Sequence, residues 1–168
     1  MESLKIFREL GDRRGIAWSL NHLGDVARDI KDFEDARAQY SESLTIFREL
    51  GDKWGIASSL TDLGNLTRDQ GDYISARAVY EESMVIFGEL GDLRGIARLL
   101  ESFAGLAAAQ AQLKRALRLF GAAAALREAL GISLSPAEQN KLKETLDSVH
   151  GGLEPGAVLL EDRPHRSA

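Results

Sequence analysis

The sequence predicts an all-α fold, a solenoid of antiparallel helix pairs that ends in a C-terminal capping helix. Three observations lead to this prediction: a repeat of 40 residues, apolar residues at helical spacing within each repeat, and glycine-aspartate pairs where one helix should end and the next begin. A repeat of this size is typical of solenoids, because each unit can bury its apolar face only against its neighbours. Such a stack exposes an extended surface, which favours a binding function over catalysis.

The repeat can be followed directly along the chain. Residues 3–40 and 43–80 are identical at 23 of 38 aligned positions, and residues 43–80 and 83–120 at 14 of 38. The motif Ser-Leu-x-Ile-Phe-Arg-Glu-Leu-Gly-Asp opens at Ser3 and again at Ser43, and a more diverged copy follows 40 residues later.

Each unit predicts two helices. In the first helix of the first unit, Ile16, Leu20, Leu23, Ala27 and Ile30 recur at steps of three and four residues, which places them on one helical face. The second helix shows the same spacing. The expected helices span residues 2–10, 13–29, 33–49, 53–69, 73–89, 93–110 and 113–129.

Glycine and aspartate mark the ends of these helices. Gly11 fits the position just past a helix, where a left-handed backbone suits glycine best. Asp12 follows as an N-cap, whose carboxylate accepts from the first free amides of the next helix. The pair returns as Gly51-Asp52, Gly71-Asp72 and Gly91-Asp92, whereas Lys31-Asp32 retains only the cap.

The C-terminal part begins with Ser135-Pro136-Ala137-Glu138, a capping box with proline at the first helical position. It predicts a helix over 136–149 whose single apolar stripe can cover the end of the stack. Residues 1–149 therefore form the expected array, and 150–168 a mobile tail. Within the tail, Val158-Leu159-Leu160 is the part that we expect to dock.

Composition narrows the class of protein. The length of 168 residues suits one domain, and the formal net charge of −5 argues against binding to nucleic acid or to an anionic membrane surface. The chain has no cysteine, so neither a disulfide framework nor a thiolate zinc site is expected. Its start lacks the pattern of a signal peptide. We therefore expect a soluble cytoplasmic protein.

No catalytic motif is found in the sequence. A phosphate-binding loop, a His-Glu-x-x-His pair and a Gly-x-Ser-x-Gly elbow are all missing. The three histidines are scattered, and the many carboxylates fall on expected solvated faces or at caps. We expect no enzymatic activity, no cofactor and no metal site.

Within each unit, the residues resemble the tetratricopeptide repeat pattern, which asks for a large residue, Leu-Gly, Ala, an aromatic residue and a small residue at set spacings. Leu20, Leu23-Gly24, Ala36, Tyr40 and Ser43 fill these positions in the first unit. The second unit repeats them, and the third has Phe103-Ala104 in place of Leu-Gly. The resemblance implies a right-handed superhelix with a concave groove lined by the first helix of each unit.

This long repeat also resembles the arrays at the C-terminal ends of bacterial STAND-type regulators, which are multidomain signalling ATPases that often carry a DNA-binding domain. The segment 115–123, followed by Leu126-Arg127-Glu128 and Ser135-Pro136-Ala137-Glu138, is similar to the exit from such an array. The resemblance implies a scaffold or sensor arm of a larger regulator. The chain itself shows no nucleotide-binding loop and no DNA-reading domain.

Spacing from Leu23-Gly24 assigns the groove positions. Asparagine can bond an amide and a carbonyl of an extended peptide, and arginine can hold a carboxylate through two donors. The alternative is that these arginines form ordinary surface ion pairs, Arg28 with Asp25 or Asp29 and Arg68 with Asp69. The candidate partner-binding residues are Trp18, Asn21, Asp25, Arg28, Asn65, Arg68 and Arg98. The other expected groove positions are Asp29, Ser58, Thr61, Asp69, Glu101, Gly105, Ala108 and Ala109.

Two aromatic residues allow different interpretations. Trp18 is either a binding anchor in the groove or a packing residue against the neighbouring helix. Trp54 lies in the first turn of its helix, where we expect partial burial by the preceding helix.

These observations predict a non-enzymatic module that binds a protein or peptide segment in its groove. The alternative is a regulatory domain that senses a small molecule, which an enclosed apolar pocket would favour. The chain opens in mid-repeat, so we expect a fragment of a longer array. Leu4, Phe7 and Leu10 should cover the helix at 13–29, and the exposed side around Ile6 should support a weak two-fold homodimer.

Overall fold

The computed structural model describes residues 2–134 continuously and scattered positions between 136 and 151. In the continuous part it contains seven helices and no strand, so the predicted all-α fold is confirmed. The helices are α1 (Glu2–Leu10), α2 (Arg13–Asp29), α3 (Phe33–Leu50), α4 (Lys53–Asp69), α5 (Tyr73–Leu90), α6 (Leu93–Ala109) and α7 (Leu113–Ala129). Three ends differ from the predicted bounds by one residue: α3 and α5 are longer, and α6 is shorter.

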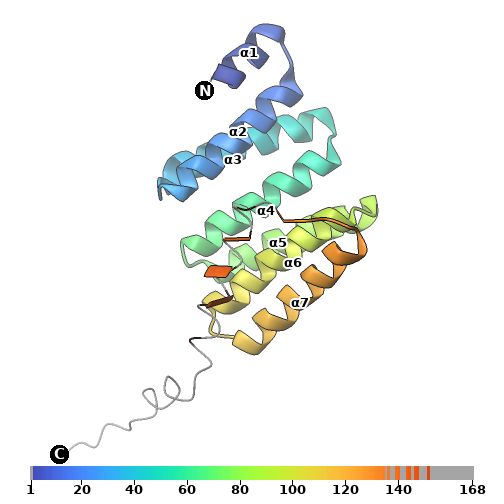
Figure 1. The fold of residues 1–168 in the computed structure, drawn as a ribbon. Coiled ribbons are helices and arrows are strands. Elements are labelled where there is room, and N and C mark those ends of the chain that lie inside the picture. Colours follow the sequence, from blue (N-terminus) through green and yellow to red (C-terminus); the bar gives the residue numbers. More distant parts are fainter. Residues whose placement is uncertain are drawn as a thin grey trace, which may run out of the picture.

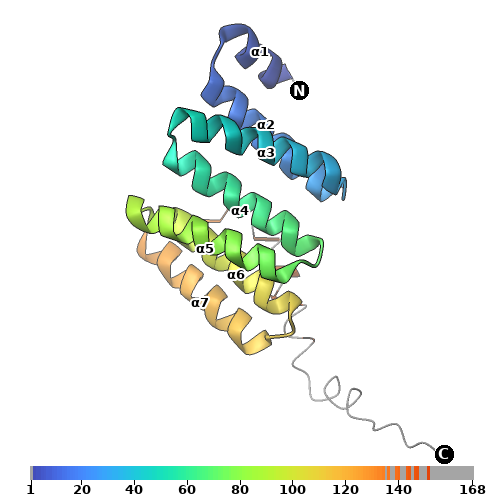
Figure 2. The ribbon, with the colours of Figure 1, turned by 180° about the vertical axis from the view of Figure 1, so that it is seen from behind.

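The helices stack as antiparallel pairs (Figure 1). The main contacts join α2 to α3, α4 to α5 and α6 to α7, and α4 also contacts both α2 and α6. The helices α2, α4 and α6 therefore form one layer, and α3 and α5 lie in front of it when the stack is seen from behind (Figure 2). The arrangement is the predicted solenoid, in which each pair is covered by its neighbours.

The turns between helices confirm the predicted caps. Gly11, Gly51 and Gly91 have φ angles of +67°, +65° and +62°. The carboxylate of Asp12 accepts from the amide of Gly15 at 3.0 Å, and Asp32, Asp52 and Asp72 likewise accept from the amide three residues on. Asp92 accepts from the amide of Arg94, two residues on. The turn at Lys31 differs from expectation, because Lys31 adopts the left-handed backbone at φ +63° although it is not glycine.

Aromatic rings from the odd-numbered helices fill the interior between the layers. Tyr40, Tyr80, Phe47 and Phe87 are completely buried. A Cβ added at Gly64 would overlap the ring of Tyr80, so glycine permits the close approach of α4 and α5.

A second set of glycines, which the sequence analysis did not single out, permits close approach between the last helix of one unit and the first helix of the next. A Cβ added at Gly15, Gly55 or Gly95 would overlap a phenylalanine ring of the preceding helix: Phe7, Phe47 and Phe87 respectively. Each phenylalanine lies eight residues before its glycine, so the two recur together with the repeat.

The N-terminal helix corrects one expectation. Leu4 and Phe7 are half-buried against the stack, but Leu10 is 73% exposed and does not cover α2. Leu10 ends its helix at the edge of the stack, as Leu50 and Leu90 do at the equivalent positions, and both of these are also exposed. Ile6 is 48% exposed, as predicted for the outer side of α1.

Two predictions concern segments that lie largely or wholly outside the described residues. The expected capping helix at 136–149 is described only at separate positions, and the expected tail at 150–168 only at Gly151. Both stay predictions.

Candidate functional site

The layer of α2, α4 and α6 carries a band of polar side chains that crosses all three units. We call it the polar strip and define it as Asp25, Arg28, Asp62, Asn65, Arg68, Asp69 and Arg98. It joins the units directly: Arg28 Nε lies 3.7 Å from Asp69 Oδ2, and Arg98 Nη2 donates to Ser58 Oγ at 2.6 Å.

Tyrosines from the other layer hold two members of the strip in place. The Tyr40 hydroxyl donates to Asp25 at 2.7 Å, and the Tyr80 hydroxyl donates to Asn65 at 2.8 Å. Burial raises the pKa of Tyr80 to about 12 and raises the pKa of Tyr40 further still. Both hydroxyls therefore remain protonated donors, and they fix the orientation of Asp25 and Asn65.

The third unit lacks this pair, and Arg68 uses the space. Gly105 and Phe120 occupy the positions of Asn65 and Tyr80, so neither side chain of the pair remains. A Cβ added at Gly105 would overlap the guanidinium of Arg68. The same guanidinium donates to Asp69 at 2.7 Å and to Asn65 at 3.4 Å. Arg68 thus extends from the second unit over the third, and its expected pair with Asp69 is present.

Arg28 is largely enclosed, with 9% of its side chain exposed. Burial opposes its charge, but Tyr40 and the carboxylates Asp25, Asp62 and Asp69 outweigh that effect, so its pKa is raised. The ion pair reaches Asp69 of the next unit instead of the expected Asp25 or Asp29. Arg28 Nη1 is buried and has no hydrogen-bond partner among the described residues.

Asp62 lies inside the stack, and the sequence analysis did not single it out. Its Oδ2 accepts from Asn21 Nδ2 at 2.8 Å. Burial raises its pKa to about 6, although Arg98 acts in the opposite direction. Aligning the repeats would have drawn attention to it, because the three units carry different polar residues at this position: His22, Asp62 and Ser102.

Three of the expected groove positions are interior. Asn21 is only 3% exposed, and its oxygen accepts from Ser59 of the next unit at 3.0 Å. Ser58 and Thr61 are completely buried, and Thr61 shares a hydrogen bond with Ser83. Asn21 therefore joins the first unit to the second and offers no group to a partner.

Trp18 packs against its neighbours. Its ring centroid lies 4.8 Å from that of Phe47 and 5.0 Å from that of Trp54, and the residue is half-buried. The packing interpretation of Trp18 is the one that this geometry favours. Trp54 keeps 42% of its surface exposed and contacts Trp18 of the preceding unit.

The chemistry of the strip is that of recognition by hydrogen bonds and ion pairs. The described residues contain no group of three histidines, aspartates or glutamates placed to hold a metal ion. Among the same residues, no helix combines the length and the apolar character that crossing a membrane requires.

Comparisons with known proteins agree with the fold. Two family models, each described as tetratricopeptide repeat, match residues 1–49 and 56–90, which together make up half of the chain. No curated protein matches the chain. The crystal structure of BtubC (BKLC) from P. vanneervenii is similar, with a TM-score of 0.60 and 24% sequence identity.

That similarity covers 79% of this chain and 56% of the BtubC chain, so the chain spans just over half the length of this structure. At this identity the likeness shows the fold alone. The family matches, the 40-residue repeat and the stacked helix pairs support a protein-interaction module. The chain belongs to the tetratricopeptide repeat family.

Proposed function

We propose that this chain is a non-enzymatic cytoplasmic module that binds a segment of a partner protein in the concave groove formed by α2, α4 and α6. The observation that carries the proposal is the continuity of the polar strip, whose hydrogen bonds and ion pairs cross from each unit to the next. An extended peptide that lies across the units would meet donors and acceptors along its whole path.

Asn65 and Arg68 are the residues that we assign to direct contact. Asn65 uses its oxygen for Tyr80 and Arg68, while its Nδ2 has no hydrogen bond among the described residues. This amide can donate to a backbone carbonyl of the partner. Arg68 can exchange its bond to Asp69 for a charge-assisted bond to a partner carboxylate.

The remaining candidates would support these two. Asp25 and Arg28 orient the first unit of the strip, and Arg98 links the second unit to the third through Ser58. Trp18 would contribute its exposed edge at the border of the groove.

Selection of peptides from a displayed library, followed by affinity measurements, tests the proposal. Asn65→Ala and Arg68→Ala should each weaken the selected peptide by about 1–3 kcal/mol without unfolding the stack. The matched control is Arg48→Ala, because Arg48 is an exposed arginine of α3 that pairs with Glu82 of α5, and both helices belong to the layer away from the groove. Unchanged affinity in both groove variants would move the site to the convex layer of α3, α5 and α7.

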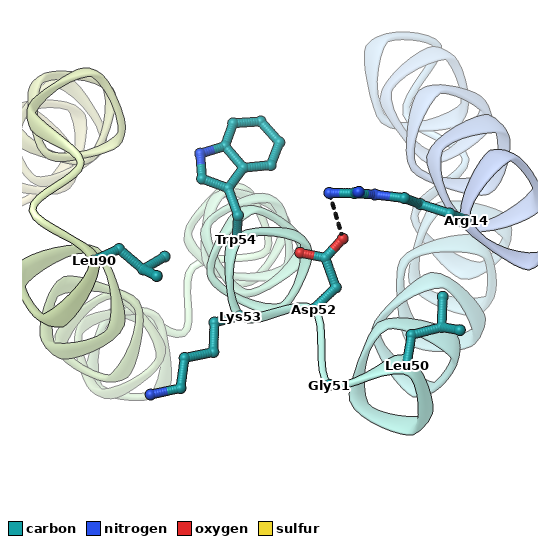
Figure 3. Close-up of a pocket in the computed structure, with 7 residues that line it drawn as sticks. All are labelled: Arg14, Leu50, Gly51, Asp52, Lys53, Trp54 and Leu90. Carbon is teal, nitrogen blue, oxygen red and sulfur yellow. Dashed lines mark ion pairs between the residues drawn. The ribbon is translucent and has the colours of Figure 1, made fainter.

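We also propose two finer roles. The module serves as the scaffold or sensor arm of a larger bacterial regulator, as the resemblance of its repeats to those of STAND-type proteins suggests. It forms a weak homodimer through the exposed side of α1. We do not extend the proposal to small-molecule sensing, because the pocket of about 600 Å³ lined by Arg14, Leu50, Gly51, Asp52, Lys53, Trp54 and Leu90 is open and lies at the edge of the stack (Figure 3).

A further inference from the structure

The end of the stack formed by α1 and α2 exposes a surface that the second unit buries (Figure 1). Val26 of α2 is 59% exposed, whereas Leu66 at the equivalent position of α4 is completely buried. Phe7 of α1 is half-buried, whereas its equivalent Phe47 is completely buried. We call this surface the open face and define it as Ser3, Phe7, Val26 and Asp29.

The helix α1 lies on α2 as α3 lies on α4. A Cβ added at Gly15 would lie 2.4 Å from the ring of Phe7. One repeat later, a Cβ added at Gly55 would lie 2.3 Å from the ring of Phe47. The open face therefore corresponds to the surface that α3 and α4 together present to α2. In the described part of the chain, no helix takes the place that α2 holds against that surface.

Contacts in the next unit show what kind of element covers such a surface. Ser43 of α3 donates to the backbone carbonyl of Ala17 in α2 at 2.8 Å. Leu66 of α4 packs in one hydrophobic cluster with Ala27 of α2. The cover is a helix that brings small residues and a backbone carbonyl close to its neighbours. The equivalent residues of the open face are exposed and lack this cover.

The open face also carries a carboxylate that the repeat pairs elsewhere. Asp69 of α4 lies 3.7 Å from Arg28 of α2, and Asp29 is the equivalent residue one unit earlier. Asp29 is exposed, and its side chain has no ion pair among the described residues. An arginine on a docked helix, placed as Arg28 is in α2, would pair with Asp29.

We propose that the open face is a docking site for one amphipathic helix of a partner protein. The helix takes the position that α2 holds against α3 and α4, and it carries an alanine followed by an arginine, as in Ala27-Arg28. A second folded copy has no such helix to offer among its described residues. Its α2 and α4 are each covered by the next unit, and α6 has Ala108 in place of the arginine. This site does not depend on binding in the groove.

A synthetic peptide with the sequence of residues 12–30 is the probe, because it reproduces α2 with its N-cap. When the labelled peptide is titrated with the full chain, its fluorescence anisotropy should rise to saturation. Val26→Glu in the chain should weaken binding roughly tenfold, since it places a charge in the apolar contact. The matched control is Val85→Glu, because Val85 is 62% exposed on α5, and it should leave the affinity unchanged.

A charge swap tests the predicted pair at Asp29. Asp29→Arg in the chain should weaken the parent peptide roughly fivefold, and a peptide with Arg28→Asp should recover most of that loss. The same altered peptide should bind the parent chain more weakly than the parent peptide does. These four affinities form a double-mutant cycle that isolates the pair.

A peptide that does not bind, or binding that survives Val26→Glu, would overturn the proposal. Survival would mean that the peptide displaces α2 from the stack instead of docking on it. A charge swap without recovery would contradict the placement of the helix and overturn it too. If the chain alone forms dimers that Val26→Glu abolishes in sedimentation, the open face belongs to a second copy and the partner helix is ruled out.

Discussion

At the scale of single residues, Asp62 is an interior carboxyl whose ionisation opposes folding. Asp62 is buried between units, and burial raises its pKa from 3.8 to about 6 against the opposing effect of Arg98. Its main partner is the side-chain amide of Asn21, which can donate a hydrogen bond to a neutral oxygen as well as to a charged one. The position therefore tolerates an uncharged side chain of the same shape.

The pH dependence of stability follows from this shift. Between about pH 4 and pH 6 the folded chain holds the Asp62 proton that the unfolded chain has released, so the free energy of unfolding falls as the pH rises through this window. Asp62→Asn should remove that contribution, which is at most about 3 kcal/mol. Urea unfolding of both proteins at several pH values measures the difference. Parallel curves for the parent and the variant would contradict the assignment.

Lys31 gives a second prediction at this scale. It adopts a φ of +63°, which costs an L-residue roughly 1 kcal/mol, while Gly71 occupies the equivalent turn without that cost. Lys31→Gly should raise the free energy of unfolding by about 0.5–1 kcal/mol, and the reciprocal Gly71→Lys should lower it. Thermal melts that show no gain for Lys31→Gly would mean that the turn is not strained.

At the scale of helices, contact between layers depends on glycine facing an aromatic ring. Gly24 and Gly64 accept Tyr40 and Tyr80, and the third unit replaces this pair by Ala104 and Phe120. Phe120 is 8% exposed, whereas both tyrosines are completely buried. The contact between Ala104 and Phe120 in the third unit therefore already accommodates the methyl group of alanine.

Enlarging the side chain at this contact should separate α4 from α5. Gly64→Leu should lower the free energy of unfolding by roughly 1–3 kcal/mol, since the new side chain must displace the ring of Tyr80. The control is Ala104→Gly, which should cost no more than about 1 kcal/mol through helix propensity. A Gly64→Leu chain as stable as the parent in denaturant would overturn the repeat register.

The helices and turns could be predicted from sequence because their determinants are local. The spacing of apolar residues and the Gly-Asp pairs determine where each helix begins and ends, and these signals involve residues only a few positions apart in the chain. The polar strip could be predicted only in part, since Asp62 meets Asn21 across 41 residues and Arg28 pairs with Asp69 of the next unit. Which face of α2 or α4 is buried depends on how the units stack, and that information is not contained in any one repeat.

At the scale of the whole molecule, the outer side of α1 presents an apolar surface. Ile6 is 48% exposed there, and Leu10, where the helix ends at the edge of the stack, is 73% exposed. Two copies related by two-fold symmetry would cover this surface, because such pairing places the same patch on both sides. Sedimentation at several concentrations should show weak dimers that Ile6→Glu abolishes. A parent chain that stays monomeric at high concentration would remove the dimer from the account.

The central claim is that partners bind across the layer of α2, α4 and α6. Site-specific photo-crosslinking in the source cell tests it most directly, with the crosslinking residue placed at Asp29, an exposed residue of α2 that we predict to face the groove, or at Val85, which is 62% exposed on α5. The account predicts a defined crosslinked partner from position 29 that Arg68→Ala diminishes, and none from position 85. The same partner captured from position 85 but not from position 29 would contradict it.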